Sequence, residues 1–158
     1  MSNGRLNTKL EAEGAEFLVL GHVLIENVEC SKAYTNYPGY DLIATSPQTG
    51  KVARIQVKMR WATNRAGFFA IDNLDCDFVV HVALNRGERR NGETVAPGDA
   101  LLAFYVFPIE IIRSVRSPSN KINIRNIPDH EQYRDAWPLI SASLKGVMPS
   151  GFVFKTLP

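Results

Sequence analysis

The stretch GYDLIATSPQTGKVARIQVKMRW, residues 39–61, predicts a β-hairpin and decides how the rest of the fold is interpreted. YDLIAT is expected to form one strand, SPQTG the loop and KVARIQVKMRW the second strand. Pro47 suits the second position of a type I turn, and Gly50 suits a left-handed residue that closes the loop. The second strand alternates between an apolar and a polar face. The polar face carries Arg54, Gln56, Lys58 and Arg60.

The loop length fixes which residues stand opposite each other in this hairpin. A loop of residues 47–50 pairs Ser46 with Lys51, and counting back along both strands places Asp41 directly across from Gln56. Opposed residues have β-carbons about 5 Å apart, which is close enough for a carboxylate and an amide oxygen to bind one cation. A loop one residue longer or shorter would turn Asp41 to the other face. The predicted site therefore depends on this register.

Asp41 and Gln56 offer the hard oxygen ligands that Mg²⁺ prefers, and a substrate phosphate with waters could complete the shell. Lys58 lies on the same face as Gln56, two residues further along, where an ammonium group can hold an attacking water or offset charge on phosphorus. The surroundings are basic, because no acidic residue occurs between Asp41 and Asp72. A solvated strand face is the alternative interpretation. The basic residues of this window are Lys51, Arg54, Lys58, Arg60 and Arg65.

The other segments predict an alternation of helices and strands. His81 lies inside an apolar run and is expected to be a hydrogen-bonded core residue. Pro108 is well placed to begin a helix, and Asp129 to cap one that runs to about Trp137. The expected elements are a helix at 8–26, strands at 28–35, 76–84 and 101–107, a polar loop at 85–99, a helix at 109–115, an edge strand at 121–126 and a docked extension at 146–158.

Length and composition bound the organisation of the chain. With 158 residues, 45% of them hydrophobic, we expect one domain over residues 1–158, with its core at about 8–116 and a C-terminal extension at 117–158. The net charge of +2 does not by itself indicate a nucleic-acid partner. We expect a soluble, cytoplasmic protein, because no apolar run approaches the roughly 18 residues of a membrane span. Cys30 and Cys76 are expected to be buried free thiols.

The helix, the strand, the YDL strand, the hairpin and the IQVK motif together resemble the PD-(D/E)XK nuclease superfamily, in the branch where Gln replaces the second acidic residue. The resemblance covers about residues 8–84. It implies a restriction-endonuclease-like α/β fold, with a mixed central β-sheet flanked by helices: a helix, a three-stranded antiparallel meander, then a further strand and helix. It also implies an endonuclease that hydrolyses phosphodiester bonds of nucleic acid, with DNA as the expected substrate and Mg²⁺ as the cofactor, Mn²⁺ being the alternative ion.

The resemblance assigns roles by position. Asp41, Gln56 and Lys58 correspond to the family's catalytic residues, and Glu16 corresponds to the glutamate that many members contribute from the first helix. Glu16, Asp41 and Gln56 are thus the expected metal ligands. Glu16 could instead cap a strand or pair with an arginine, and Glu11 and Glu13 are weaker candidates for its role. The residues expected to contact nucleic acid are Arg54, Arg60, Arg65 and Lys51.

Two departures from the family pattern favour a second hypothesis. Tyr40 stands where the family has proline, and Gln56 removes one negative charge from the metal site. A catalytically inactive nucleic-acid-binding or assembly module on the same fold is therefore the alternative, and an unrelated α/β domain is a third. For an active enzyme, cutting both strands of a duplex calls for two sites, so the resemblance also implies a homodimer.

Overall fold

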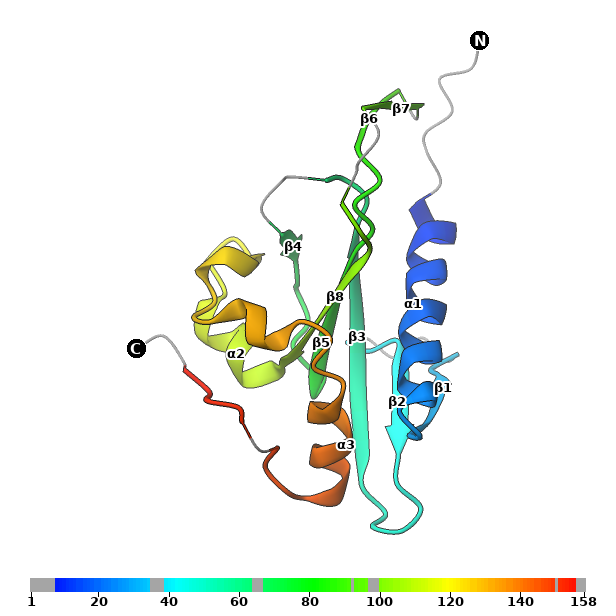
Figure 1. Cartoon of the computed structure of the whole chain (residues 1–158), viewed down its shortest axis with the longest axis vertical. Helices are drawn as coiled ribbons and strands as arrows, with labels where there is room; N and C mark the ends of the chain where they lie inside the picture. Colours follow the sequence, from blue (N-terminus) through cyan, green and yellow to red (C-terminus); the bar gives the residue numbers. More distant parts are fainter. Residues whose placement is uncertain are drawn as a thin grey trace.

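A mixed sheet of five strands forms the centre of the computed structural model, which describes residues 8–34, 39–63, 67–91, 93–96, 100–149 and 151–155 (Figure 1). The first three strands form the predicted antiparallel meander, the fourth is parallel to the third, and the last is antiparallel to the fourth. In sheet order the strands are β1 (Glu29–Lys32), β2 (Leu42–Thr45), β3 (Val52–Arg60), β5 (Phe78–Ala83) and β8 (Ala103–Pro108).

Strand pairing sorts the side chains of this sheet into two faces, because directly paired residues project to the same side. Lys58 pairs with His81, which pairs with Tyr105, and these three residues form one row across β3, β5 and β8. Gln56, two residues before Lys58 on β3, begins the neighbouring row of paired residues on the same face. We call this side the Lys58 face. The opposite side carries, among others, Ile55, the partner of Leu42.

The opposite side is covered by α1 (Thr8–Ile25), so we call it the α1 face. The ring of His22 on α1 stacks on Trp137, with centroids 4.8 Å apart, and meets Phe104 of β8 edge-on at 4.5 Å. Phe104 pairs with Val82, which follows His81 on β5, so both side chains project to the side opposite the Lys58 face. Trp137 directly precedes α3 (Pro138–Lys145), so the start of α3 packs beside α1.

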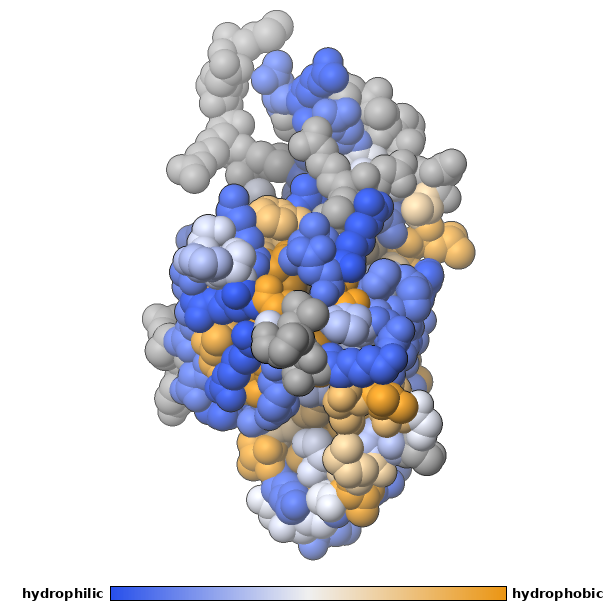
Figure 2. Space-filling model, turned by 90° about the vertical axis from the view of Figure 1, so that its left-hand side faces the viewer, coloured by the Kyte–Doolittle hydropathy of each residue, from blue (hydrophilic) through white to orange (hydrophobic). Residues whose placement is uncertain are grey.

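The chain after β8 wraps round the edge of the sheet from one face to the other. Tyr133 contacts Phe107 on the Lys58 face, Arg134 forms an isolated bridge with Tyr105, and Trp137 reaches the α1 face. Over the central strand β5, the ring of Phe69 stacks on His81. The side of the molecule that carries α2 (Ile109–Val115) is largely hydrophilic, with separate hydrophobic patches between (Figure 2).

The smaller elements differ most from the sequence predictions. The segment predicted as a polar loop contains a short hairpin, and residues 121–126 contain a three-residue strand followed by a 3₁₀ turn. No α-helix begins at Asp129. This residue is left-handed (φ +51°), its side chain makes no capping bond, and it precedes only a 3₁₀ turn; the α-helix begins instead at Pro138. These elements are β4 (Phe68–Ala70) paired with β9 (Lys121–Asn123), β6 (Glu88–Arg90) paired with β7 (Glu93–Ala96), and the 3₁₀ turns η1 (Ile124–Asn126) and η2 (His130–Tyr133).

One hydrophobic cluster includes residues from both parts of the predicted domain. Ile122, Tyr133, Ile140 and Leu144 are buried in the same cluster as Val19 of α1. The segment predicted as an extension therefore supplies part of the core. None of the helices in the described ranges combines the length and the apolar content that a bilayer crossing requires.

Both cysteines are free thiols, as predicted. Cys76 is buried and Cys30 is half-buried. Burial raises the pKa of each thiol to about 11, so neither is a thiolate at neutral pH.

Candidate active site

The hairpin has the register that the sequence predicts. The amide of Ser46 donates to the carbonyl of Lys51 (3.0 Å), and Leu42 pairs with Ile55. Gly50 closes the loop with a φ of +70°, a conformation that glycine adopts without strain. The loop of residues 47–50 is therefore confirmed, and with it the alignment that brings Asp41 to β3.

Asp41 is fixed beside Gln56 by two hydrogen bonds to its neighbours on β3. The amide of Asp41 donates to the carbonyl of Ile55 (2.8 Å), and its carboxylate accepts from the amide of Val57 (2.7 Å). Its own carbonyl accepts from Ala33 (2.9 Å). In a regular strand the N–H and C=O of one residue point to the same neighbour, so the backbone turns at Asp41. Asp41 thus lies just outside β2, where β3 continues without β2 as a partner but stays paired with β5.

Gln56 presents an oxygen that lacks a partner. The residue is only 9% exposed, and its Oε1 atom is buried and accepts no hydrogen bond from the described residues. A buried amide oxygen left in this state costs about 1–3 kcal/mol. The carboxylate of Asp41 is bound to the amide of the next residue on the strand, Val57 (2.7 Å), and together the two groups offer the hard oxygen ligands that a cation such as Mg²⁺ accepts.

Lys58 is half-buried on the same face, two residues beyond Gln56. Among the residues that the structure describes, its ammonium group has no hydrogen bond or ion pair. A lysine whose charge is not compensated by a carboxylate can interact with a phosphate. The structure therefore places Asp41 against the strand that carries Gln56 and Lys58.

Glu16 forms an ion pair. Its carboxylate is 2.9 Å from the ammonium of Lys32, which is also 3.0 Å from Glu13 and 4.5 Å from the centre of the Phe17 ring. Burial acts to lower the pKa of Lys32, but the hydrogen bonds to Glu16 and Glu13 raise it above its ordinary value. Lys32 pairs with Leu42 and so belongs to the α1 face.

The ion pair resembles the structural alternative considered for Glu16, with lysine in place of arginine. Within the described part of the chain, no group of three or more His, Cys, Asp and Glu side chains could hold a metal ion. The role of Glu16 as a metal ligand stays a prediction.

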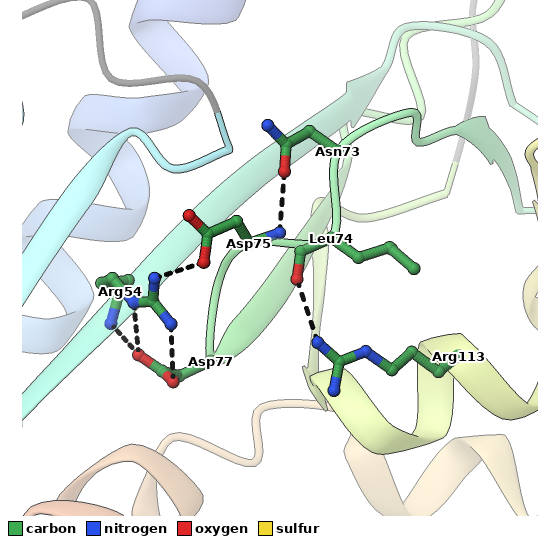
Figure 3. A network of polar contacts seen from close by, with 6 residues as sticks. All are labelled: Arg54, Asn73, Leu74, Asp75, Asp77 and Arg113. Carbon is green, nitrogen blue, oxygen red and sulfur yellow. Dashed lines mark hydrogen bonds and ion pairs between the residues drawn. The ribbon is translucent and has the colours of Figure 1, made fainter.

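The residues predicted to contact nucleic acid differ in whether a carboxylate of the protein compensates their charge. Arg54 is held by two aspartates: its Nε atom is 3.2 Å from Asp77, and its Nη1 atom donates to Asp75 (Figure 3). Hydrogen bonds to Asp77 and Asp75 raise the pKa of Arg54 above its ordinary value, against the effect of burial. Its charge is thus compensated within the protein.

Arg60 donates to the carbonyl of Phe68 (2.9 Å) and has no carboxylate partner among the described residues. Lys51 sits at the hairpin end of β3, roughly 23 Å along the strand from Lys58. Arg65 lies outside the described residues. For all four cations, contact with nucleic acid stays a prediction.

His81 is the residue that the sequence interpretation missed. It is fully buried, as predicted, but neither ring nitrogen has a hydrogen-bond partner among the described residues, contrary to the expectation. Burial, and secondarily the charge of Arg60, lowers its pKa to about 4. Its position one strand from the edge of the sheet and next to Lys58 follows from the parallel pairing of β3 with β5, which no local sequence pattern fixes.

The chain is similar to known proteins in sequence and in fold. The model of a family described as PD-(D/E)XK endonuclease matches residues 6–140. The structure of a bacterial homing endonuclease is 24% identical in sequence, covers 89% of this chain and 96% of its own, and superposes with a TM-score of 0.60. A Holliday junction resolvase from the archaeal hyperthermophile Archaeoglobus fulgidus is 14% identical over 89% of this chain and 99% of its own, with a TM-score of 0.47. No curated protein matches. The similarity to the homing endonuclease confirms the predicted restriction-endonuclease-like fold.

Proposed function

Because the chain belongs to the PD-(D/E)XK endonuclease family, whose activity is the cleavage of nucleic acid, we propose that it hydrolyses DNA in a reaction that requires Mg²⁺. The observation that carries this proposal is the buried, unpartnered Oε1 atom of Gln56, on the strand whose next amide, that of Val57, binds the carboxylate of Asp41. A carboxylate and an orphaned amide oxygen at the end of a strand pairing are a donor set for a hard cation.

Asp41 and Gln56 would hold the metal ion in this proposal. When bound, Mg²⁺ polarises a phosphoryl oxygen and makes bound water more acidic. Asp41 is the charged ligand, and its orientation is fixed because one carboxylate oxygen accepts the Val57 amide. Gln56 contributes a neutral oxygen, so the pair supplies one negative charge and depends on substrate phosphate for the rest.

Lys58 would act on the substrate directly. Its ammonium group can donate a hydrogen bond to the attacking water and balance the negative charge that develops on phosphorus. The rigid pairing of Lys58 with His81 fixes its backbone relative to Gln56. Glu16 would join the metal ligands only by leaving Lys32 or by acting through a water, and Lys32 currently binds its carboxylate.

The test is nicking of supercoiled plasmid with Mg²⁺, with Mn²⁺ and with a chelator. We expect the wild-type protein to nick in either metal, and Lys58→Ala to lose at least a hundredfold in rate. Lys145→Ala, which removes an exposed lysine on α3, is the matched control and should nick normally. Nicking in the chelator, or equal rates for both lysine variants, would contradict the proposal.

A homodimer belongs to the same proposal. Exposed apolar side chains on α1 support it, because such side chains gain from burial against a second copy. Light scattering should give twice the monomer mass of 17.6 kDa. A monomeric mass at the concentrations used for cleavage would contradict it. The exposed residues are Leu10, Phe17, Leu18, Leu24 and Ile25.

A further inference from the structure

A pocket of about 380 Å³ lies on the Lys58 face, beside the candidate active site. Its floor is formed by β5 and β8, where His81, Ala83 and Tyr105 line it, and its walls come from η1 and η2. Lys58 and His81 are direct partners on neighbouring strands, which lie about 4.8 Å apart. The pocket therefore starts one strand away from the proposed catalytic lysine.

His81 gives this pocket a buried polar group without a partner. Its side chain is 0% exposed, and Nδ1 and Nε2 both lack hydrogen bonds among the described residues. The ring of Phe69 stacks on it with centroids 5.1 Å apart and an interplanar angle of 17°, which holds the imidazole plane in place. A neutral imidazole has one donor and one acceptor nitrogen. A planar ligand with an acceptor or a donor at its edge would satisfy one of these two nitrogens.

The rim of the pocket is positively charged. Arg60, Arg125 and Arg134 line it, whereas Glu131 is the only carboxylate among its lining residues. Glu131 accepts the hydroxyl of Tyr105 (3.1 Å) and lies 3.2 Å from His130 and 3.9 Å from Arg134, so it compensates one of the three arginines. The Nε atom of Arg60 is buried and has no partner among the described residues. This excess of donors suits a phosphate group.

The floor leaves room for a flat ring. Ala83 and Ala103 are paired on β5 and β8, and both line the pocket. Their small side chains, with the imidazole edge beside them, match a nucleobase better than a bulky or flexible group. A volume of this size is within the usual range of about 300–1,000 Å³ for ligand pockets.

We propose that the pocket binds one unpaired nucleotide of the nucleic-acid substrate, with its base at His81 and its phosphate among the rim arginines. The proposal rests on the proposed function, since a strand bound at Lys58 is what would bring a nucleotide to the pocket. A base in a duplex is stacked and paired, so the nucleotide must be extrahelical or single-stranded to enter. The substrate class is then DNA with an unpaired nucleotide next to the cut.

Binding of a mononucleotide tests the pocket without any cleavage. The Lys58→Ala protein is titrated without metal with deoxyadenosine 5′-monophosphate and with deoxyribose 5-phosphate, which lacks the base. We expect the nucleotide to bind at least tenfold more tightly than deoxyribose 5-phosphate. Ala83→Leu, which fills the floor, and Arg125→Ala, at an exposed rim position, should each weaken it at least fivefold. Arg90→Ala, which removes an exposed arginine outside the pocket, is the matched control.

Absence of nucleotide binding, equal binding of the sugar phosphate, or unchanged binding in both pocket variants would overturn the proposal. A second assay compares cleavage of a duplex carrying one bulged nucleotide with cleavage of the fully paired duplex. We expect the bulged duplex to be cut at least tenfold faster, and the ratio to fall towards one in Ala83→Leu. Cleavage without nucleotide binding overturns the pocket alone, whereas nucleotide binding without cleavage of any duplex overturns the proposed function.

Discussion

Replacing Gln56 with methionine should stabilise the metal-free protein and abolish its activity. Methionine is close to glutamine in size and unbranched, but it does not require a hydrogen bond. In the native chain the buried Oε1 atom of Gln56 has no partner among the described residues, which costs about 1–3 kcal/mol. Removing that cost should raise the free energy of unfolding of Gln56→Met by about the same amount.

The assay is thermal unfolding in a chelator, followed by the plasmid nicking assay in Mg²⁺. For a chain of this length, 1 kcal/mol corresponds to about 2–4 °C in Tm, so we expect a rise of roughly 2–12 °C. Mg²⁺ should raise the Tm of the wild type and leave that of Gln56→Met unchanged, because only a protein that binds the ion is stabilised by it.

The matched control is Gln132→Met. The amide nitrogen of Gln132 donates to the carbonyl of Val153 (3.0 Å), so this substitution removes a satisfied hydrogen bond and should lower the stability by about 0.5–1.5 kcal/mol. A lower Tm for Gln56→Met than for the wild type would show that Oε1 already has a partner in the metal-free protein. Full nicking activity in Gln56→Met would refute its role as a ligand.

Three further predictions follow from the ion pairs and from His81. Arg54→Met should lower the free energy of unfolding by about 1 kcal/mol and leave the salt dependence of DNA binding unchanged. Arg60→Met should reduce the slope of log K for DNA binding against log salt concentration by about one. Equal slopes for both variants would contradict this difference. Glu16→Gln should slow nicking at least tenfold, and Glu13→Gln should not. Equal losses of nicking rate in the two variants would instead mean that both residues act by binding Lys32. The pKa of His81 is lowered to about 4 in the folded protein, below its ordinary value of 6.5, so the unfolded chain binds the extra proton first as the pH falls. The free energy of unfolding, measured in urea, should thus be at its full value above about pH 6.5 and fall by up to roughly 3 kcal/mol towards pH 4. A His81→Phe variant that shows the same decline would exclude His81 as its source.

The elements that the sequence predicts correctly are those whose signals are local. The hairpin around Gly50 follows from turn chemistry and strict alternation, and α1 follows from a long apolar segment. The central position of β5 follows from its uninterrupted apolar run, because such a strand must be covered on both faces. These local features were enough to place Gln56 and Lys58 on one face of β3 and Asp41 against the same strand.

The features that the sequence does not predict depend on contacts between distant segments. β4 and β9 are three-residue strands, too short for any periodicity to show. The compensation of Arg54 by Asp75 and Asp77 depends on the parallel pairing of β3 with β5 (Figure 3). The ion pair of Glu16 with Lys32 joins a helix to a strand whose relative placement no spacing fixes. The same holds for the pocket at His81, which combines residues from 60 to 134.

The central claim is that Asp41 and Gln56 bind a divalent cation next to Lys58. The most direct measurement is anomalous scattering from a crystal of the protein soaked in Mn²⁺. We predict one strong peak within coordination distance of the Asp41 carboxylate and the Gln56 Oε1 atom, and its loss in a crystal of Gln56→Met. A peak at any other group of residues, or a Gln56 amide that remains unbound in crystals whose protein nicks DNA in Mn²⁺, would contradict the claim.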